Sequence, residues 1–184
     1  MKKLIISANP STNWFTHQIV KRLNELSIEN GHEAKILDLY QTWVVQYYLT
    51  YEDKKDIWKD KQTIVMQELI TWADELIFVF PIWWWDMPAI MKNFWDTNFT
   101  VWFAYNYLKW WKNIWLLNWK QVRVIATSWS PAFLFRFVLP LPFIWRFFRV
   151  WFCWMKLKSF TIFWSMDNSK TDRTKYLYKI DKLV

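Results

Sequence analysis

The sequence predicts an α/β fold in which a five-stranded parallel sheet is covered by helices on both faces. Short, almost continuously apolar segments alternate along the chain with segments whose apolar residues recur at helical spacing. Strands that are apolar on both sides are typical of parallel sheets buried between helices. The 184 residues are 54% hydrophobic and 22% charged, which suffices for one core. We therefore expect a single domain over residues 1–184.

The first quarter of the chain supplies a strand, a helix and a second strand. Residues 3–8 read KLIISA and predict a short buried strand. Polar residues that can cap a helix follow it, and residues 15–30 then carry apolar side chains at helical spacing. Gly31 lies where a helix commonly ends on glycine. Residues 33–39 predict the second strand.

The middle of the chain contains the clearest buried strand, residues 75–80, which reads ELIFVF and is followed by Pro81. An irregular polar stretch and a predicted helix at residues 61–73 precede it. Residues 87–99 predict another helix, with Pro88 near its start, where proline is well tolerated.

The last third completes the alternation. Residues 121–127 predict a fourth strand and residues 157–163 a fifth. Between them, residues 132–150 look partly helical and are interrupted by prolines. A final helix is predicted at residues 170–183.

Five strands in this order suit the flavodoxin-like winding, a three-layer sandwich. In that architecture ligands bind beyond the carboxyl ends of the strands, where the winding changes direction. The loops at residues 9–16, 81–88 and 127–131 all follow predicted strands, and we expect the functional site there.

The charge pattern and the few metal-binding residues limit the possible partners. The net charge is +8, but the 24 Lys and Arg are scattered, which predicts a solvated basic surface and no nucleic-acid partner. Cys153 is the one cysteine and lies among aromatic residues, so we expect a buried, inert thiol. With two histidines, a metal site is not expected.

The amino-terminal apolar run is too short for a signal peptide, and we expect a cytoplasmic protein. Residues 132–155 are the one membrane-like stretch. Three arginines in it, at positions 136, 146 and 149, argue against a membrane span. Contact of this stretch with a membrane surface remains open.

The first loop, ANPSTNWFTH, lacks the glycine patterns of dinucleotide and Walker phosphate sites. It offers small polar side chains at a helix N-terminus, where free N–H groups attract anions. Plain N-capping requires the same residue types, so a phosphate site and a capping role both remain open. The second loop offers three aromatic residues that can wall a flat ring, and the third, ATSWSP, offers small hydroxyl side chains.

These segments together resemble the flavin-dependent NAD(P)H:quinone oxidoreductase family. The stretch FPIWWWDMPAIMKNF, followed by FAYNY, is similar to the family signature. IISANPSTNWFTH resembles the family's first loop, ATSWSPAF its third loop, and WFCWMK a late FCG stretch. The resemblance implies a flavodoxin-like fold, FAD or FMN as cofactor and NAD(P)H as co-substrate. It also implies ping-pong transfer of two electrons through the bound flavin to a quinone-like acceptor, in a homodimer with the flavin at the interface.

The resemblance also implies site residues by position. The flavin's phosphate end would meet Asn9, Ser11, Phe15 and Thr16. Its ring would contact Ile82, Trp83, Trp84 and Trp85, with Thr127, Ser128, Trp129 and Ser130 at the far edge. The substrate face would be lined by Phe103 and Tyr105. No catalytic side chain is implied. A Tyr–His pair that some members place after the third loop is missing, and Phe133 and Phe135 lie there instead.

Two alternative functions remain open. Some members of this family are ancillary subunits of potassium-efflux transporters, without a catalytic role. A membrane-surface binding protein that uses residues 132–155 is the other alternative.

The chain contains 18 Trp and 1 Gly, whereas glycine makes up about 7% of an ordinary chain. The resemblance places aromatic-tolerant positions at Trp72, Trp83, Trp84 and Trp95, and Trp85 fits either group. Glycine or another small residue is usual in the family at Trp14, Trp102, Trp119, Trp129, Trp151, Trp154 and Trp164. Loop-like contexts that suit glycine surround Trp43, Trp58, Trp110, Trp111, Trp115 and Trp145.

Some bacterial lineages read the codon UGA as glycine and others read it as tryptophan. We therefore hypothesise that many of these tryptophans stand for glycines encoded by UGA. A naturally tryptophan-rich protein and deliberate replacement of glycine are the alternatives.

Overall fold

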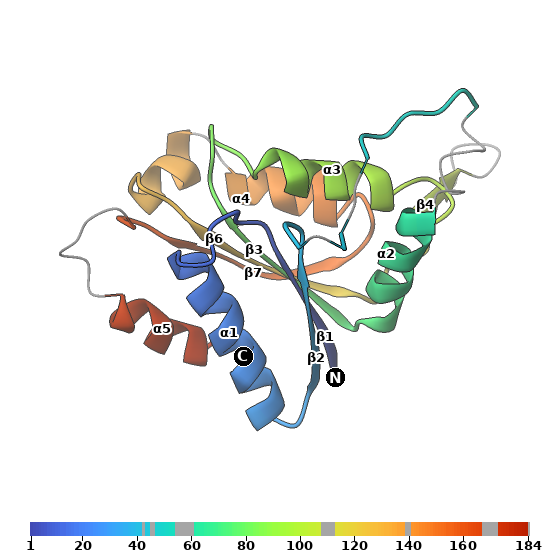
Figure 1. Ribbon diagram of the computed structural model, residues 1–184. Coiled ribbons are helices and arrows are strands. Elements are labelled where there is room, and N and C mark those ends of the chain that lie inside the picture. The colour runs from blue at the N-terminus through green and yellow to red at the C-terminus, as the bar shows by residue number, and fades with distance from the viewer. Residues whose placement is uncertain are drawn as a thin grey trace.

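A computed structural model describes residues 1–41, 43–44, 47–53, 61–107, 113–138, 141–166 and 173–183. Five parallel strands form the central sheet in the order β2-β1-β3-β6-β7 (Figure 1). This is the strand order of the flavodoxin-like fold, which confirms the predicted fold class.

The five strands lie close to their predicted positions. They are β1 (Lys2–Ser7), β2 (Glu33–Asp38), β3 (Glu75–Pro81), β6 (Gln121–Thr127) and β7 (Lys156–Phe163). Every residue of β3, the central strand, is buried. Its register pairs Pro81 with Thr127 of β6, so these two strands end side by side.

Helices cover both faces of the sheet, as predicted (Figure 1). The helical segments are α1 (Phe15–Glu29), α2 (Lys61–Trp72), α3 (Ala89–Asn98), η2 (Leu134–Val138), α4 (Leu141–Ile144), η3 (Trp145–Val150) and α5 (Thr174–Asp181). Helices α1 and α5 pack on one face, and α2, α3 and the segment from α4 to η3 pack on the other. Alternate residues of each strand serve the two cores, since Ile77 faces α1 while Phe78 faces α3.

A short antiparallel hairpin was not predicted. Strand β4 (Tyr105–Tyr107) pairs with β5 (Asn113–Trp115) outside the main sheet. The first residues of the predicted last helix, 170–172, lie outside the described residues, and so do Trp58, Trp110 and Trp111.

The described residues of the segment 132–155 form η2, α4 and η3, with a turn after η3. No helix in the described ranges is long and apolar enough to cross a membrane. The expectation that Trp145 lies in a loop that suits glycine is wrong. Its side chain is fully buried and stacks on Phe80, with ring centroids 5.5 Å apart. It is buried because the turns of α4 and η3 aim it at the sheet.

Charged side chains are buried at the amino-terminal edge of the sheet. Arg123 donates from Nε to the Glu75 carboxylate at 3.0 Å, and Lys3 lies 3.8 Å from the same group. Lys120 is fully buried and donates from Nζ to the backbone carbonyls of Thr71, in the last turn of α2, and Ala73, just after that helix. Burial lowers the pKa of Lys120 to about 8, although its two carbonyl partners favour the charged form. These contacts join α2 to the sheet far from the loops at the carboxyl edge.

Candidate functional site

Three loops meet at the carboxyl edge of the sheet, because β1, β3 and β6 are neighbours and run in one direction. Backbone hydrogen bonds continue the strand pairing into the loops. The N–H of Ala8 donates to Val79 O at 3.1 Å, and the N–H of Ile82 donates to Thr127 O at 2.7 Å. The first residues of the loops are therefore held in fixed positions. The loops lie at the edge of the sheet where the sequence predicts the site.

The first loop is organised around Asn9, whose side chain is buried. Its Nδ2 donates to Thr16 Oγ1 at 3.0 Å, while its Oδ1 accepts from the N–H of Ser11 at 3.0 Å. The side chain thereby holds the loop against the start of α1. No side chain caps α1, whose N-cap residue is Trp14. The first N–H groups of a helix lack intrahelical acceptors, so this end can receive an anion.

The second loop contains a tight turn at its tip. The N–H of Trp83 donates to Asp86 O at 2.9 Å, and the N–H of Asp86 donates to Trp83 O at 3.0 Å. Trp84 and Trp85 are the two central residues of this turn, and both have positive φ. Asp86 also accepts a hydrogen bond from Arg149 Nη2 at 2.8 Å, which ties the loop to η3.

The third loop is held by its neighbours on both sides. The N–H of Ser128 donates to Phe163 O at 2.8 Å, and Ser128 O accepts from the N–H of Met166 at 3.2 Å. The Ser128 hydroxyl accepts from the N–H of Ser130 at 3.0 Å. Trp129 lies between these two serines and is 67% exposed, because the turn aims its indole outward.

The second and third loops enclose a cavity of about 390 Å³, within the usual range for ligand pockets. Seven predicted cofactor-binding residues line it: Ile82, Trp83, Trp84, Trp85, Ser128, Trp129 and Ser130. Phe135 lines it too, although sequence analysis did not select it as a site residue. The ring centroid of Phe135 lies 5.3 Å from that of Trp85. Its position just after the third loop is the sequence feature that could have indicated it as a lining residue. The described lining residues are aromatic, aliphatic or hydroxyl-bearing, and none of them is charged.

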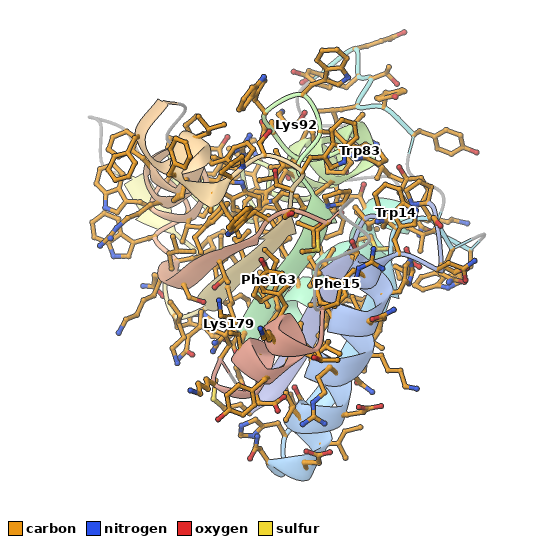
Figure 2. The ribbon with its side chains drawn as sticks, turned by 90° about the vertical axis from the view of Figure 1, so that its left-hand side faces the viewer. Trp14, Phe15, Trp83, Lys92, Phe163 and Lys179 are labelled. Carbon is orange, nitrogen blue, oxygen red and sulfur yellow. The ribbon has the colours of Figure 1, made fainter. Side chains whose placement is uncertain are left out.

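The other predicted cofactor residues lie outside this cavity. Asn9, Ser11 and Thr16 build the first loop, and Thr127 is buried at the end of β6. Phe15 is buried between α1 and β7, with its ring 6.3 Å from that of Phe163 (Figure 2). Its side chain belongs to the core, so its backbone N–H is what it can offer a ligand.

A second and larger cavity, of about 1060 Å³, lies beside α3 and η3. Tyr105, one of the two predicted substrate residues, lines it together with Trp102, Arg149 and Phe152. Tyr105 packs edge-on against Phe152 at 4.9 Å. Phe103, the other predicted substrate residue, packs against the core. Neither residue lines the smaller cavity, so one chain holds the predicted flavin residues and Tyr105 in separate cavities.

Among the described residues that line the two cavities, Cys153 carries the one thiol. Cys153 lines the larger cavity, but burial raises the pKa of its thiol to about 12, as the inert role expected for it requires. Within the described ranges, no group of three or more His, Cys, Asp or Glu side chains could hold a metal ion. The chemistry of the site therefore depends on what the cavities bind.

Comparison with known proteins places this arrangement in a family. The family model described as a flavodoxin-like fold matches residues 1–183. The crystal structure of Smu.1420 from Streptococcus mutans superposes with a TM-score of 0.86 and 32% identity, covering 100% of this chain and 98% of that one.

Two curated relatives are named as oxidoreductases. An uncharacterized NAD(P)H oxidoreductase of Haemophilus influenzae is 32% identical over 115 residues, 57% of this chain and 54% of the relative. An FMN-dependent NADH:quinone oxidoreductase of Mycoplasmoides gallisepticum is 28% identical over 138 residues, 71% of this chain and 69% of the relative. The chain spans about half the length of two of the curated relatives that it matches.

Proposed function

This chain belongs to the family of the flavodoxin-like fold, and we propose that it is a flavin-dependent NAD(P)H:quinone oxidoreductase. The observation that carries the proposal is the aromatic cavity at the carboxyl edge of β3 and β6, beside a helix N-terminus that no side chain caps. Relatives named as FMN-dependent NADH:quinone oxidoreductase and NAD(P)H oxidoreductase support the same chemistry.

The residues present fit a flavin in two respects. Aromatic side chains and the backbone of Ile82–Trp85 form an apolar wall suited to a flat ring system. The N–H groups that open α1 suit a phosphate, and the buried Asn9 fixes the loop beside them. When bound, a flavin supplies the two-electron chemistry that links NAD(P)H to a quinone.

The protein's own part in this reaction is to bind and orient. Ser128 and Ser130 offer hydroxyl groups at the edge of the cavity, with the third loop held by the Phe163 and Met166 backbone. The ion pair between Asp86 and Arg149 holds the second loop in place. No side-chain acid is required, which agrees with the uncharged lining.

We further propose that the working unit is a homodimer. The flavin cavity and the cavity lined by Tyr105 are separate in one chain. A second copy that places its larger cavity over the smaller cavity of the first would bring Tyr105 to the flavin face. Exposed aromatic side chains near the larger cavity, including Tyr48 at its rim and Trp102, supply apolar surface for such a contact.

A membrane surface is a second candidate partner, favoured by one observation. The segment 133–152 exposes several large aromatic side chains: Phe133, Phe137, Phe143, Trp151 and Phe152. Exposed Arg146 lies in the same segment. Co-sedimentation with anionic vesicles that persists in high salt would support insertion of these rings, whereas loss of binding in salt would indicate surface attraction alone.

The enzymatic proposal is tested by incubating the chain with FMN or FAD, removing free flavin and recording the visible spectrum. We expect retained flavin, and turnover of NADH or NADPH with a quinone in a ping-pong pattern of parallel double-reciprocal lines. Ser128→Ala should weaken flavin retention, while Ser159→Ala, a serine of β7 at a distance from the carboxyl edge, serves as the matched control. Because Trp84 and Trp85 line the cavity, the same test is run with glycine at both positions. If both chains fold and neither retains flavin, the proposal is overturned and a non-catalytic binding role is favoured.

A further inference from the structure

Tryptophan occupies backbone positions that favour glycine. Within the described ranges, five residues other than glycine have positive φ: Trp84 (48°), Trp85 (68°), Trp102 (73°), Trp154 (57°) and Ser165 (63°). An L-residue is strained in the left-handed region, and a bulky side chain there is an outlier. Tryptophan makes up 18 of 184 residues, so chance placement would give none or one among these five. Four of the five are tryptophan.

The end of helix α1 shows which residue the chain uses at a left-handed position of the same kind as Trp154. Helix α1 ends in a Schellman motif, in which the N–H of His32 donates to Ser27 O and the N–H of Gly31 to Ile28 O, both at 2.9 Å. Gly31, the one glycine of the chain, is the left-handed residue of this motif, with φ of 71°.

The end of η3 repeats the same hydrogen bonds. The N–H of Met155 donates to Val150 O at 3.0 Å, and the N–H of Trp154 donates to Trp151 O at 2.8 Å. Trp154 therefore occupies the position that Gly31 occupies at the end of α1. The same motif carries glycine once and tryptophan once.

The turn at the tip of the second loop gives a second, independent case. Trp84 and Trp85 are the central pair of a two-residue turn closed by hydrogen bonds in both directions between Trp83 and Asp86. Positive φ at both central residues is what a type I′ turn requires, and Asn-Gly or Gly-Gly is the usual sequence. Trp84 is 96% exposed, so packing of its ring does not explain its presence.

Trp102 lies in a third tight turn. Its N–H donates to Tyr105 O at 2.7 Å, and the N–H of Ala104 donates to Thr100 O at 2.9 Å. The ring is 59% exposed. By contrast, Trp95 lies within α3, is buried and stacks on Phe99 at 3.9 Å, as expected for a true core tryptophan.

We propose that positions 84, 85, 102 and 154 carry glycine in the working protein, because its gene holds the codon UGA at these positions and its source organism reads UGA as glycine. The structure narrows the set given by the sequence. The positive φ supports glycine at positions 102 and 154, where the sequence already suggested it. It also favours glycine at position 85, which fitted either group, and at position 84, which the sequence analysis had placed among the aromatic-tolerant positions. The structure also assigns Trp95 to an ordinary tryptophan codon.

Glycine at positions 84 and 85 would also change the flavin cavity, a consequence that rests on the proposed function. Trp84 and Trp85 line the smaller cavity. With glycine at both positions, the backbone of the turn itself would form this wall, and a flat ligand could approach it without displacing two indoles. Residues 84 and 85 would then be positions that control access to the cavity.

The proposal is tested first on the gene and on the protein from its source. We expect UGA at codons 84, 85, 102 and 154, UGG at codon 95, and glycine at the four positions in peptides sequenced by mass spectrometry. UGG at the four codons, or tryptophan in the peptides, would overturn the proposal and leave a naturally tryptophan-rich or deliberately altered chain.

A second test concerns the backbone and needs no flavin. The full chain is compared in two fourfold variants, with all four tryptophans changed to Gly or all four to Ala. We expect the Gly variant to melt higher than the Ala variant, because both lose the same rings and one retains Cβ atoms in the left-handed region. Equal or reversed melting would overturn the backbone argument. A Gly variant that melts higher but retains no FMN would leave this inference standing and contradict the proposed function.

Discussion

Removing the side chain of Trp84 isolates the effect of the backbone on stability. The ring is 96% exposed, so its loss removes almost no packing, and Trp84→Ala should change the free energy of unfolding by less than about 0.5 kcal/mol. Trp84→Gly removes the same ring and also removes Cβ. The difference between the two variants therefore measures what φ of 48° costs a residue with a Cβ atom.

The expected difference follows from two opposing terms. A left-handed L-residue costs about 1–2 kcal/mol, and glycine loses about 0.4–1 kcal/mol more chain entropy on folding than alanine. Glycine should therefore be more stable than alanine at position 84 by about 0.5–1 kcal/mol. For a chain of this size, such a gain raises the melting temperature by about 1–4 °C.

Thermal and urea unfolding, followed by far-ultraviolet circular dichroism, measure this difference. Trp151 supplies the matched control, because it is 57% exposed but has a right-handed φ of −67°. There glycine should be less stable than alanine, by about 0.5–1 kcal/mol. A stability difference between the glycine and alanine variants that has opposite signs at positions 84 and 151 would support this reasoning. It would be refuted if Trp84→Gly were no more stable than Trp84→Ala.

Four further outcomes are expected. Burial lowers the pKa of Lys120 from 10.5 to about 8 in the folded chain, so the unfolded chain binds the proton more tightly. The free energy of unfolding of the unaltered chain should therefore rise relative to that of Lys120→Met as the pH rises from about 8 to 10.5. Urea unfolding that gives the same pH dependence for both chains would contradict this. Trp95→Ala should lower the free energy of unfolding by about 3–5 kcal/mol, since it empties a buried stacked site; a loss below about 1 kcal/mol would contradict its core role. Arg149→Met should cost about 1 kcal/mol in the same assay and weaken FMN retention by freeing Asp86, so unchanged retention argues against the proposed positioning role. Tyr105→Ala should raise the quinone KM while FMN retention stays constant, and a loss of FMN instead would place Tyr105 on the flavin half of the site.

Sequence patterns predicted the main sheet because strand burial leaves a direct signal. Residues 121–127 match β6 in both bounds, since the alternate residues Val122, Val124 and Ala126 are apolar and every residue after Gln121 is buried. The β4–β5 hairpin was missed because its strands have three residues each, too few to show a period. Trp145 was misread because residues 141–150 carry a proline and several aromatic residues without helical spacing, and burial by the sheet overrides that local signal.

The three loops selected from the sequence lie at one edge of the sheet, because parallel strands bring their carboxyl ends there whatever the loops contain. That this edge holds the functional site stays a prediction. What the sequence did not reveal is the separation of the site into two cavities. Phe103 and Tyr105 are two residues apart and both pack against the core, yet of the two only Tyr105 lines the larger cavity. That difference depends on the turn at Trp102 and on the position of Phe152, which are tertiary features.

The most direct test of the central claim is anaerobic titration of the FMN-loaded chain with NADH, followed by addition of a quinone, with the visible absorbance of the flavin recorded throughout. We expect the absorbance to fall on addition of about one equivalent of NADH and to return when quinone is added to the NADH-free protein, because each half of a ping-pong reaction occurs alone. Retained FMN whose absorbance does not change with NADH would contradict the account, since the cavity would then bind a flavin without supporting the reaction.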